Sequence, residues 1–153
     1  MNNPNNLFHP QNRIDTAKAR ITSSKILLDE KRFSASIYFA GVAVESVLRA
    51  FIERNNKTFE ERHNIQKMSE HTSIHPFYSN SNKMRDCFDK IILYWDNKYR
   101  YTDDVKLMSF YQSKGLVKHS KLRDSSILKN FATQCNEAAV SIVTKGIELY
   151  KGV

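Results

Sequence analysis

Apolar residues recur every three or four positions along most of the chain, which is the repeat of one face of an α-helix. The first stripe covers residues 14–28 and the second covers residues 33–51, with only a short polar break between them. A connection this short predicts two helices that pack as antiparallel neighbours. Two further stripes cover residues 84–95 and 128–149. The pattern therefore predicts four long helices.

Shorter elements are expected between the long stripes. Residues 59–68 can form a short helix, whereas residues 69–82 contain Ser, Asn, His and Pro76 and are expected to form a loop. Thr102 is the expected N-cap of a second short helix over residues 105–111. A small side chain at Gly41 is expected to let another segment's backbone approach the second long helix.

Strand signals are weak, because no Asn-Gly or Asp-Gly hairpin dipeptide occurs. We therefore predict an all-α fold, a bundle of four long helices of about 15 to 25 residues with one or two short helices. Residues 1–12 are rich in Asn and Pro and are expected to be a flexible lead-in. Residues 13–153 are then expected to form a single domain.

Charge and cysteine usage narrow the classes of function. The chain has 24 basic and 16 acidic side chains, a formal charge of +8. Such an excess either favours polyanionic partners such as RNA or has no bearing on function. Cys87 and Cys135 form no CxxC pair, which suits a reducing cytoplasm. No run of 18 or more apolar residues occurs, so no membrane span is expected and a cytoplasmic location is predicted.

Three segments resemble the signatures of HEPN domains, in the order in which that family carries them. The first is Tyr38-Phe-Ala-Gly-Val-Ala-Val-Glu-Ser-Val-Leu-Arg-Ala50, an aromatic residue and Ala-Gly followed by a helical Glu and, four residues later, Arg. The second is Phe59-Glu-Glu-Arg-His-Asn-Ile65, which is similar to the family's Phe followed by His-Asp-Leu. The third is Trp95-Asp-Asn-Lys-Tyr-Arg-Tyr101, which is similar to its Trp followed by Arg-Tyr.

The resemblance implies a helical bundle that is frequently a homodimer and needs no cofactor. Family members often act in toxin–antitoxin or phage-defence systems, where many are metal-independent ribonucleases. Others lie beside minimal nucleotidyltransferases, or are nucleotide-binding or adaptor modules. The partners implied are RNA or a nucleotide, and an antitoxin, a nucleotidyltransferase or another defence protein.

The chain departs from the ribonuclease members at their active site. Those members carry an Arg followed after four to six residues by a His, and no Arg of this chain has a His at that spacing. The pair that comes nearest to this spacing is Lys114 with His119, in which Lys takes the place of Arg. Because Lys lacks the planar fork with which Arg grips a phosphate, the usual site is expected to be absent or rebuilt.

Glu45, Arg49, Arg100 and Tyr101 are the first candidates for function. Glu45 and Arg49 stand four apart on one helix and can form an ion pair. Either this pair binds a phosphate, or it is a structural network, which is the interpretation we favour. Arg100 can bind phosphate and Tyr101 can stack on a base. Alternatively, both close the bundle by bonding to Glu45 or to backbone carbonyls.

Histidines supply the acid–base candidates. Imidazole is suited to proton transfer near neutral pH, so His63 is the candidate general base or acid, unless it only caps the short helix. RNA cleavage through the 2′-hydroxyl needs only such a proton shuttle and cations beside the phosphate. His71 and His75 have the spacing of two metal ligands, but they stand in an expected loop without a nearby carboxylate cluster, so no metal site is predicted.

The densest basic run is the candidate nucleic-acid contact. It consists of Lys114, Lys118, His119, Lys121 and Arg123. With Tyr111 nearby as a stacking partner, it can grip a nucleic-acid backbone, or it is simply a solvated loop.

Two functions follow as expectations. The first is a helical module of a prokaryotic toxin–antitoxin or phage-defence system, without the usual ribonuclease site, that dimerises and binds RNA, a nucleotide or a partner protein. The alternative is a metal-independent ribonuclease whose site is rebuilt around His63 or His119 with Arg100 and Tyr101.

Overall fold

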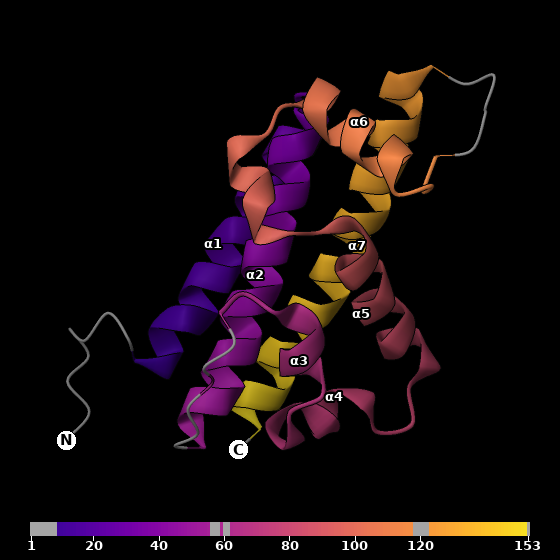
Figure 1. The fold of residues 1–153 in the computed structure, drawn as a ribbon. Coiled ribbons are helices and arrows are strands. Elements are labelled where there is room, and N and C mark those ends of the chain that lie inside the picture. Colours follow the sequence, from indigo (N-terminus) through magenta and orange to yellow (C-terminus); the bar gives the residue numbers. More distant parts are fainter. Residues whose placement is uncertain (1–8, 56–58, 60–61, 118–122, 153) are drawn as a thin grey trace.

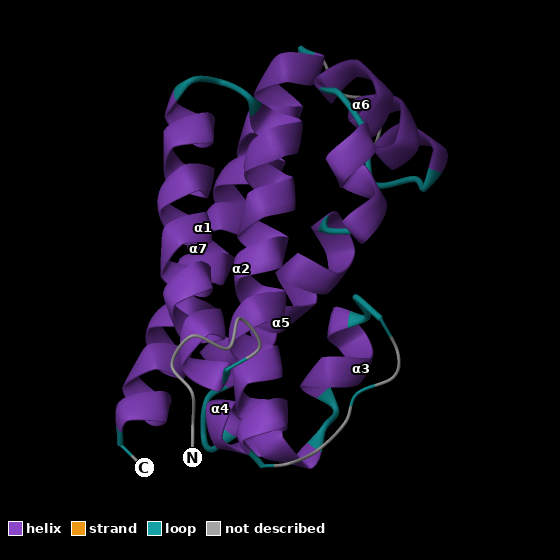
Figure 2. Cartoon of the chain, turned by 90° about the vertical axis from the view of Figure 1, so that its left-hand side faces the viewer, coloured by secondary structure: helices purple, strands orange, loops and turns teal. Residues whose placement is uncertain are grey.

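The computed structural model describes residues 9–55, 59, 62–117 and 123–152, and every regular element in these ranges is helical. The long helices are α1 (Pro10–Asp29), α2 (Phe33–Arg54), α5 (Asn82–Tyr94) and α7 (Asp124–Lys151) (Figure 1). Helices α1, α2 and α7 contact one another along the long axis of the molecule (Figure 2), and α5 packs on α7. The predicted all-α class and the four-helix bundle are confirmed.

Five short helices complete the described chain. They are α3 (Ile65–Ser69), the 3-10 helix η1 (Thr72–Ile74), α4 (His75–Tyr78), the 3-10 helix η2 (Asn97–Tyr101) and α6 (Asp104–Ser113). Helices α3 and α4 lie at one end of the bundle and α6 lies at the other (Figure 1). The 3-10 helix η2 contacts α2.

The start of one long helix and the lengths of two others differ from the expected ones. Helix α1 begins at Pro10, inside the expected lead-in, because His9 caps it through Nδ1, which accepts from the backbone N–H of Gln11 at 3.1 Å. Helix α5 has only 13 residues, because Trp95 leaves the helix with extended backbone angles. Helix α7 has 28 residues, more than expected.

The short elements correct the sequence-based predictions. The helix predicted over residues 59–68 begins only at Ile65, where the side chain of Asn64 caps it. The loop predicted over residues 69–82 contains η1 and α4, and Pro76 stands in the first turn of α4, where proline is tolerated. The N-cap of α6 is Asp103 rather than Thr102, because its carboxylate accepts from the Lys106 N–H at 2.8 Å.

Helix α2 is the centre of the core. It is long and apolar enough to cross a membrane, but 72% of its most apolar 18-residue window is buried inside the protein, as in a central core helix. Three buried polar residues also tie the bundle together. Ser24 of α1 and Ser36 of α2 exchange hydrogen bonds of 2.8–2.9 Å, and Asn136 of α7 donates to the Ser24 hydroxyl at 2.8 Å.

Gly41 receives the side chain of Trp95. A Cβ atom at Gly41 would stand 2.0 Å from Cδ1 of the indole, so no larger residue fits there without displacing the ring. The indole N–H donates to the Tyr38 carbonyl at 3.0 Å. The close approach that we predicted at Gly41 is therefore made by a side chain and not by another backbone. This interlock fixes the segment after α5 against α2.

Candidate functional site

Glu45 is the centre of a cluster of charged side chains. Its side chain, on α2, is only 9% exposed. Arg49, one turn later, donates from Nε to Oε1 of Glu45 at 2.9 Å. His63, from the turn before α3, brings Nδ1 to 2.8 Å from the same oxygen and to 3.0 Å from Oε2. The ion pair expected between Glu45 and Arg49 is thus present, and His63 is a second partner of the Glu45 carboxylate.

The backbone of His63 turns its side chain toward α2. Its φ is +58°, in the left-handed region that residues other than glycine seldom adopt. Such a conformation persists when surrounding contacts hold it, and here the Glu45 carboxylate holds the ring. His63 is not the cap of α3, because the neighbouring Asn64 accepts from the Lys67 N–H at 3.0 Å.

The hydrogen bond to Glu45 assigns the proton on the imidazole ring. An ionised carboxylate only accepts, so Nδ1 of His63 carries a proton and donates. In the neutral ring, Nε2 is then left as an acceptor. A carboxylate orients the histidine of serine hydrolases in the same way. The His63 side chain is 43% exposed, so a solute can reach the ring.

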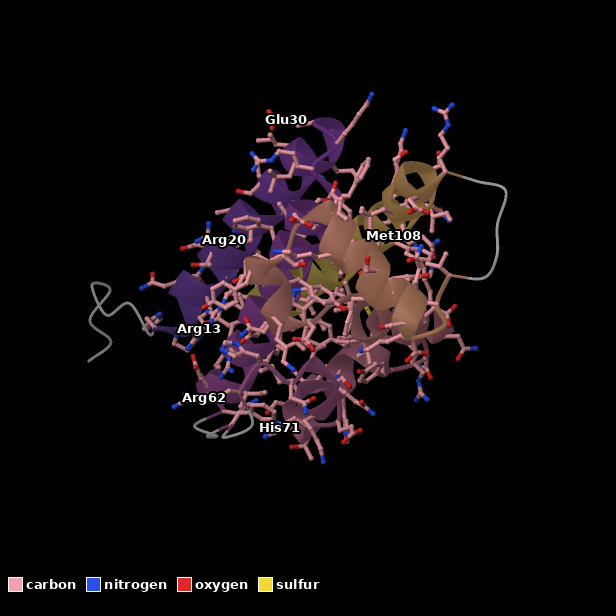
Figure 3. All side chains as sticks on the ribbon, turned by 45° about the horizontal axis from the view of Figure 1, so that its top comes forward. Arg13, Arg20, Glu30, Arg62, His71 and Met108 are labelled. Carbon is pink, nitrogen blue, oxygen red and sulfur yellow. The ribbon has the colours of Figure 1, made fainter. Side chains whose placement is uncertain are left out.

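A cavity of about 410 Å³ opens beside His63. It is lined by residues 62–66, by Ile92 of α5 and by residues 95–98. Two cations, Arg62 and Lys98, and one acid, Asp96, line it. Figure 3 shows Arg62 at the same end of the molecule as His71, with Met108 of α6 toward the other end.

Arg100 and Tyr101 do not join this cluster. Arg100 is exposed on η2, and its guanidinium carbon lies 4.5 Å from the centre of the Tyr101 ring, which is 75% exposed. Within the part of the chain that the structure describes, neither residue forms a hydrogen bond or ion pair with Glu45 or His63. The expectation that Arg100 closes the bundle through Glu45 is therefore wrong, whereas a catalytic role of His63, Arg100 and Tyr101 stays a prediction.

The basic run between α6 and α7 is described only at its ends. Lys114 is the C-cap of α6 and Arg123 is the N-cap of α7, and both are exposed. Lys118, His119 and Lys121 lie outside the described residues.

Tyr111, which we expected to stack on a base, is fully buried. Its hydroxyl donates to the Tyr94 carbonyl at 2.6 Å. Burial raises the pKa of Tyr111 above its usual value. The ring beside the basic run is instead Phe110, whose centre lies 4.4 Å from Nζ of Lys114.

His71, His75 and Cys135 have structural surroundings. Nδ1 of His71 accepts from the Ser73 N–H at 3.1 Å, which caps η1, and His75 begins α4. No group of three potential metal ligands occurs among the described residues. Burial raises the pKa of the Cys135 thiol to about 12, so this cysteine stays protonated and unreactive near neutral pH.

Sequence reasoning did not single out Arg62 and Lys98, which line the cavity, or Phe110, which lies beside Lys114. Arg62 precedes His63 and Lys98 follows Trp95, inside two of the three recognised signatures. The available signal was the place of Arg62 directly before His63 and of Lys98 three residues after Trp95. Phe110 gave no signal of its own, because spacing along α6 alone does not show which of two adjacent aromatic rings faces solvent.

Comparison with known proteins gives one match. The model of the HEPN domain family matches residues 11–139, most of the chain. No curated protein and no solved structure matches.

Proposed function

This chain belongs to the HEPN domain family, and from that premise we propose that it is an RNA-binding module of a prokaryotic toxin–antitoxin or phage-defence system. Domains of this family are generally linked to nucleotide- or RNA-related toxin or defence functions and often dimerise. The proposed assembly is a cytoplasmic homodimer with twofold symmetry that also contacts an antitoxin, a nucleotidyltransferase or another defence protein.

The observation that supports RNA binding is a surface on η2 and α6 where exposed aromatic rings stand beside cations. Arg100 lies over Tyr101, and Lys114 lies over Phe110, which is 37% exposed. The Phe110 ring also packs on Tyr99 at 5.8 Å between centres, which joins the two elements. Aromatic rings that stack on bases, with cations that bind phosphates, are the features by which proteins hold single-stranded RNA. We call these four residues, Arg100, Tyr101, Phe110 and Lys114, the aromatic–cationic surface.

The charge of this region suits a polyanion. Arg100, Lys106 and Lys114 are exposed, and none has a carboxylate partner among the described residues. Two nearby acids, Asp103 and Asp104, are engaged with backbone N–H groups: Asp103 caps α6, and Asp104 accepts from the Ser34 N–H at 2.7 Å. The acids therefore hold the fold of α6, while the cations remain available to phosphates.

The second candidate function is a metal-independent ribonuclease with a rebuilt site, and the bond between Glu45 and His63 is the observation that favours it. A carboxylate that fixes Nδ1–H leaves Nε2 able to accept the proton of a 2′-hydroxyl. The family's usual Arg–His spacing is missing, however, and among the described residues no hydrogen bond joins an arginine to His63. RNA binding without cleavage is therefore the function we propose.

Substitution of Tyr101 tests this proposal. Tyr101→Ala should weaken binding of a single-stranded RNA by about fivefold to a hundredfold, since one aromatic–base stack contributes about 1–3 kcal/mol. Tyr101→Phe keeps the ring and should retain the affinity. Lys114→Ala should lower the dependence of affinity on salt by about 0.7 in log–log slope, the counterion release of one phosphate contact on a single strand.

Lys83→Ala, which removes an exposed lysine from the start of α5, is the matched control for charge. Fluorescence anisotropy with labelled RNA measures all four variants. Because Tyr101 is 75% exposed, its replacement should leave the melting temperature unchanged. Equal RNA affinity of Tyr101→Ala and the parent protein would show that the aromatic–cationic surface is not the binding site.

A further inference from the structure

We propose that a second cavity binds a free basic amino acid such as lysine or arginine, at a site separate from the aromatic–cationic surface. The cavity has a volume of about 670 Å³, within the range of roughly 300–1,000 Å³ that small-molecule sites occupy. The end of α3, helix α4, the turn after α4 and helix α5 line it, at the end of the bundle opposite α6 (Figure 1). Among the described residues, Ile92 alone lines both this cavity and the one beside His63.

The charges in the walls set this cavity apart from an otherwise basic protein. The chain has a formal charge of +8, yet two acids, Glu70 and Asp89, and one arginine, Arg85, line the cavity. All three are exposed, and none forms an ion pair within the described residues. His75 also lines the cavity and adds no charge in its neutral form. The charged walls therefore disfavour a phosphate and favour a ligand with two positive groups and one negative group.

The charged side chains gather around the ring of Tyr78. The guanidinium carbon of Arg85 lies 5.7 Å from the centre of this ring, and Asp89 follows Arg85 by one turn of α5. Burial raises the pKa of Tyr78 above its usual value, and Asp89 and Glu70 add to the rise. The Ser69 hydroxyl and Arg85 act in the opposite direction. The two carboxylates and the guanidinium are thus close enough to one phenol to affect its ionisation, and one small ligand can meet all of them.

An apolar floor lies among the charged groups. Phe88 is 1% exposed, and the centre of its ring lies 5.0 Å from that of Tyr78. Phe77 packs edge-on against Phe88 at 6.1 Å between centres, which fixes the floor within the core. Ile92, one turn after Phe88, extends the floor along α5. The methylene stem of a long basic side chain packs well on such a surface while its charged end reaches a polar rim.

The class of ligand follows from these groups. Arg85 presents the planar set of donors that matches a carboxylate. Asp89 and Glu70 can each accept hydrogen bonds from an ammonium or guanidinium group. A basic α-amino acid combines one carboxylate, two cationic groups and an apolar stem between them. A lysine or arginine side chain within a partner protein offers only one of the two cationic groups and no α-carboxylate.

Isothermal titration calorimetry of the intact protein at two temperatures tests the ligand. Lysine and arginine are compared with norleucine, which lacks the side-chain amine, and with cadaverine, which lacks the carboxylate. We expect saturable binding of lysine or arginine, and binding of norleucine and cadaverine that is weaker by about fivefold to tenfold, the effect of one charged contact at an exposed site. No saturable heat from lysine or arginine up to about 10 mM would overturn the proposal. Equal affinity for Nα-acetyl-lysine amide, which mimics a side chain of a partner protein, would also overturn it.

Substitutions locate the site. Asp89→Asn should weaken the binding of both lysine and cadaverine by about fivefold to tenfold, whereas Arg85→Gln should weaken lysine binding and not cadaverine binding. Asp86→Asn is the matched control, because Asp86 is exposed on the same helix and is not among the described lining residues. Tyr101→Ala should leave lysine affinity unchanged, which separates this test from that of the RNA surface. Full lysine affinity in the Glu70→Gln/Asp89→Asn double variant, or an equal loss in Asp86→Asn, would overturn the proposal.

Discussion

Gly41→Ala should lower the free energy of unfolding by about 2–4 kcal/mol, although alanine ordinarily stabilises a helix interior by about 1 kcal/mol relative to glycine. The added Cβ would stand 2.0 Å from Cδ1 and 2.1 Å from Nε1 of Trp95. The indole must therefore move, which breaks its 3.0 Å bond to the Tyr38 carbonyl and leaves both groups without their partner. Chemical denaturation followed by circular dichroism measures the change.

Gly152→Ala is the control for this prediction. Gly152 follows α7 with φ of −78°, and a Cβ there would meet only backbone oxygens at 3.6 Å and 3.9 Å. This substitution should change the stability by no more than about 0.5 kcal/mol. A Gly41→Ala protein as stable as the parent, or more stable, would show that the indole does not occupy the space against Gly41.

Arg49→Ala should lower the free energy of unfolding by about 3 kcal/mol. It removes one of the two partners that the Glu45 carboxylate has among the described residues, and breaking a buried ion pair costs about 3–5 kcal/mol. The Glu45 side chain is only 9% exposed. The bond from His63 remains, so the lower end of that range applies. Adding Glu45→Gln to Arg49→Ala should recover part of the loss, because the uncompensated charge is then gone.

Arg100→Ala is the matched control, since Arg100 is exposed and makes no contact with Glu45 among the described residues. It should change the stability by no more than about 0.5 kcal/mol. Thermal and denaturant unfolding of the parent protein and these three variants gives the comparison. If Arg49→Ala is as stable as the parent but no longer binds RNA, the cluster around Glu45 has a functional and not a structural role.

The long helices could be predicted from the sequence because their apolar stripes are local and repeat many times. The pairing of Glu45 with Arg49 was also predictable from local sequence, because side chains four positions apart on a helix lie next to each other. The helix boundaries were harder to predict, because single side chains decide them. His9 caps α1 earlier than expected, and Asn64 caps α3 later than expected.

The third member of the cluster could not be predicted in this way. His63 reaches Glu45 across 18 positions and through a positive φ, and neither leaves a periodic signal. Arg100 was the wrong choice of partner because η2 turns it toward Tyr101 and solvent. A five-residue 3-10 helix after Trp95 has no stripe that would have shown which of its side chains face α2.

The central claim is that this HEPN domain binds RNA without cleaving it, and one measurement tests both parts. The purified protein is incubated with total RNA and with tRNA in the presence of a chelator, over about pH 6 to 9, the range in which a histidine can act as general acid or base. Gel shift and denaturing electrophoresis of the same samples then report binding and cleavage. We predict shifted RNA of unchanged length at every pH. Cleavage that appears with the parent protein and disappears with His63→Gln would contradict the claim and establish the ribonuclease.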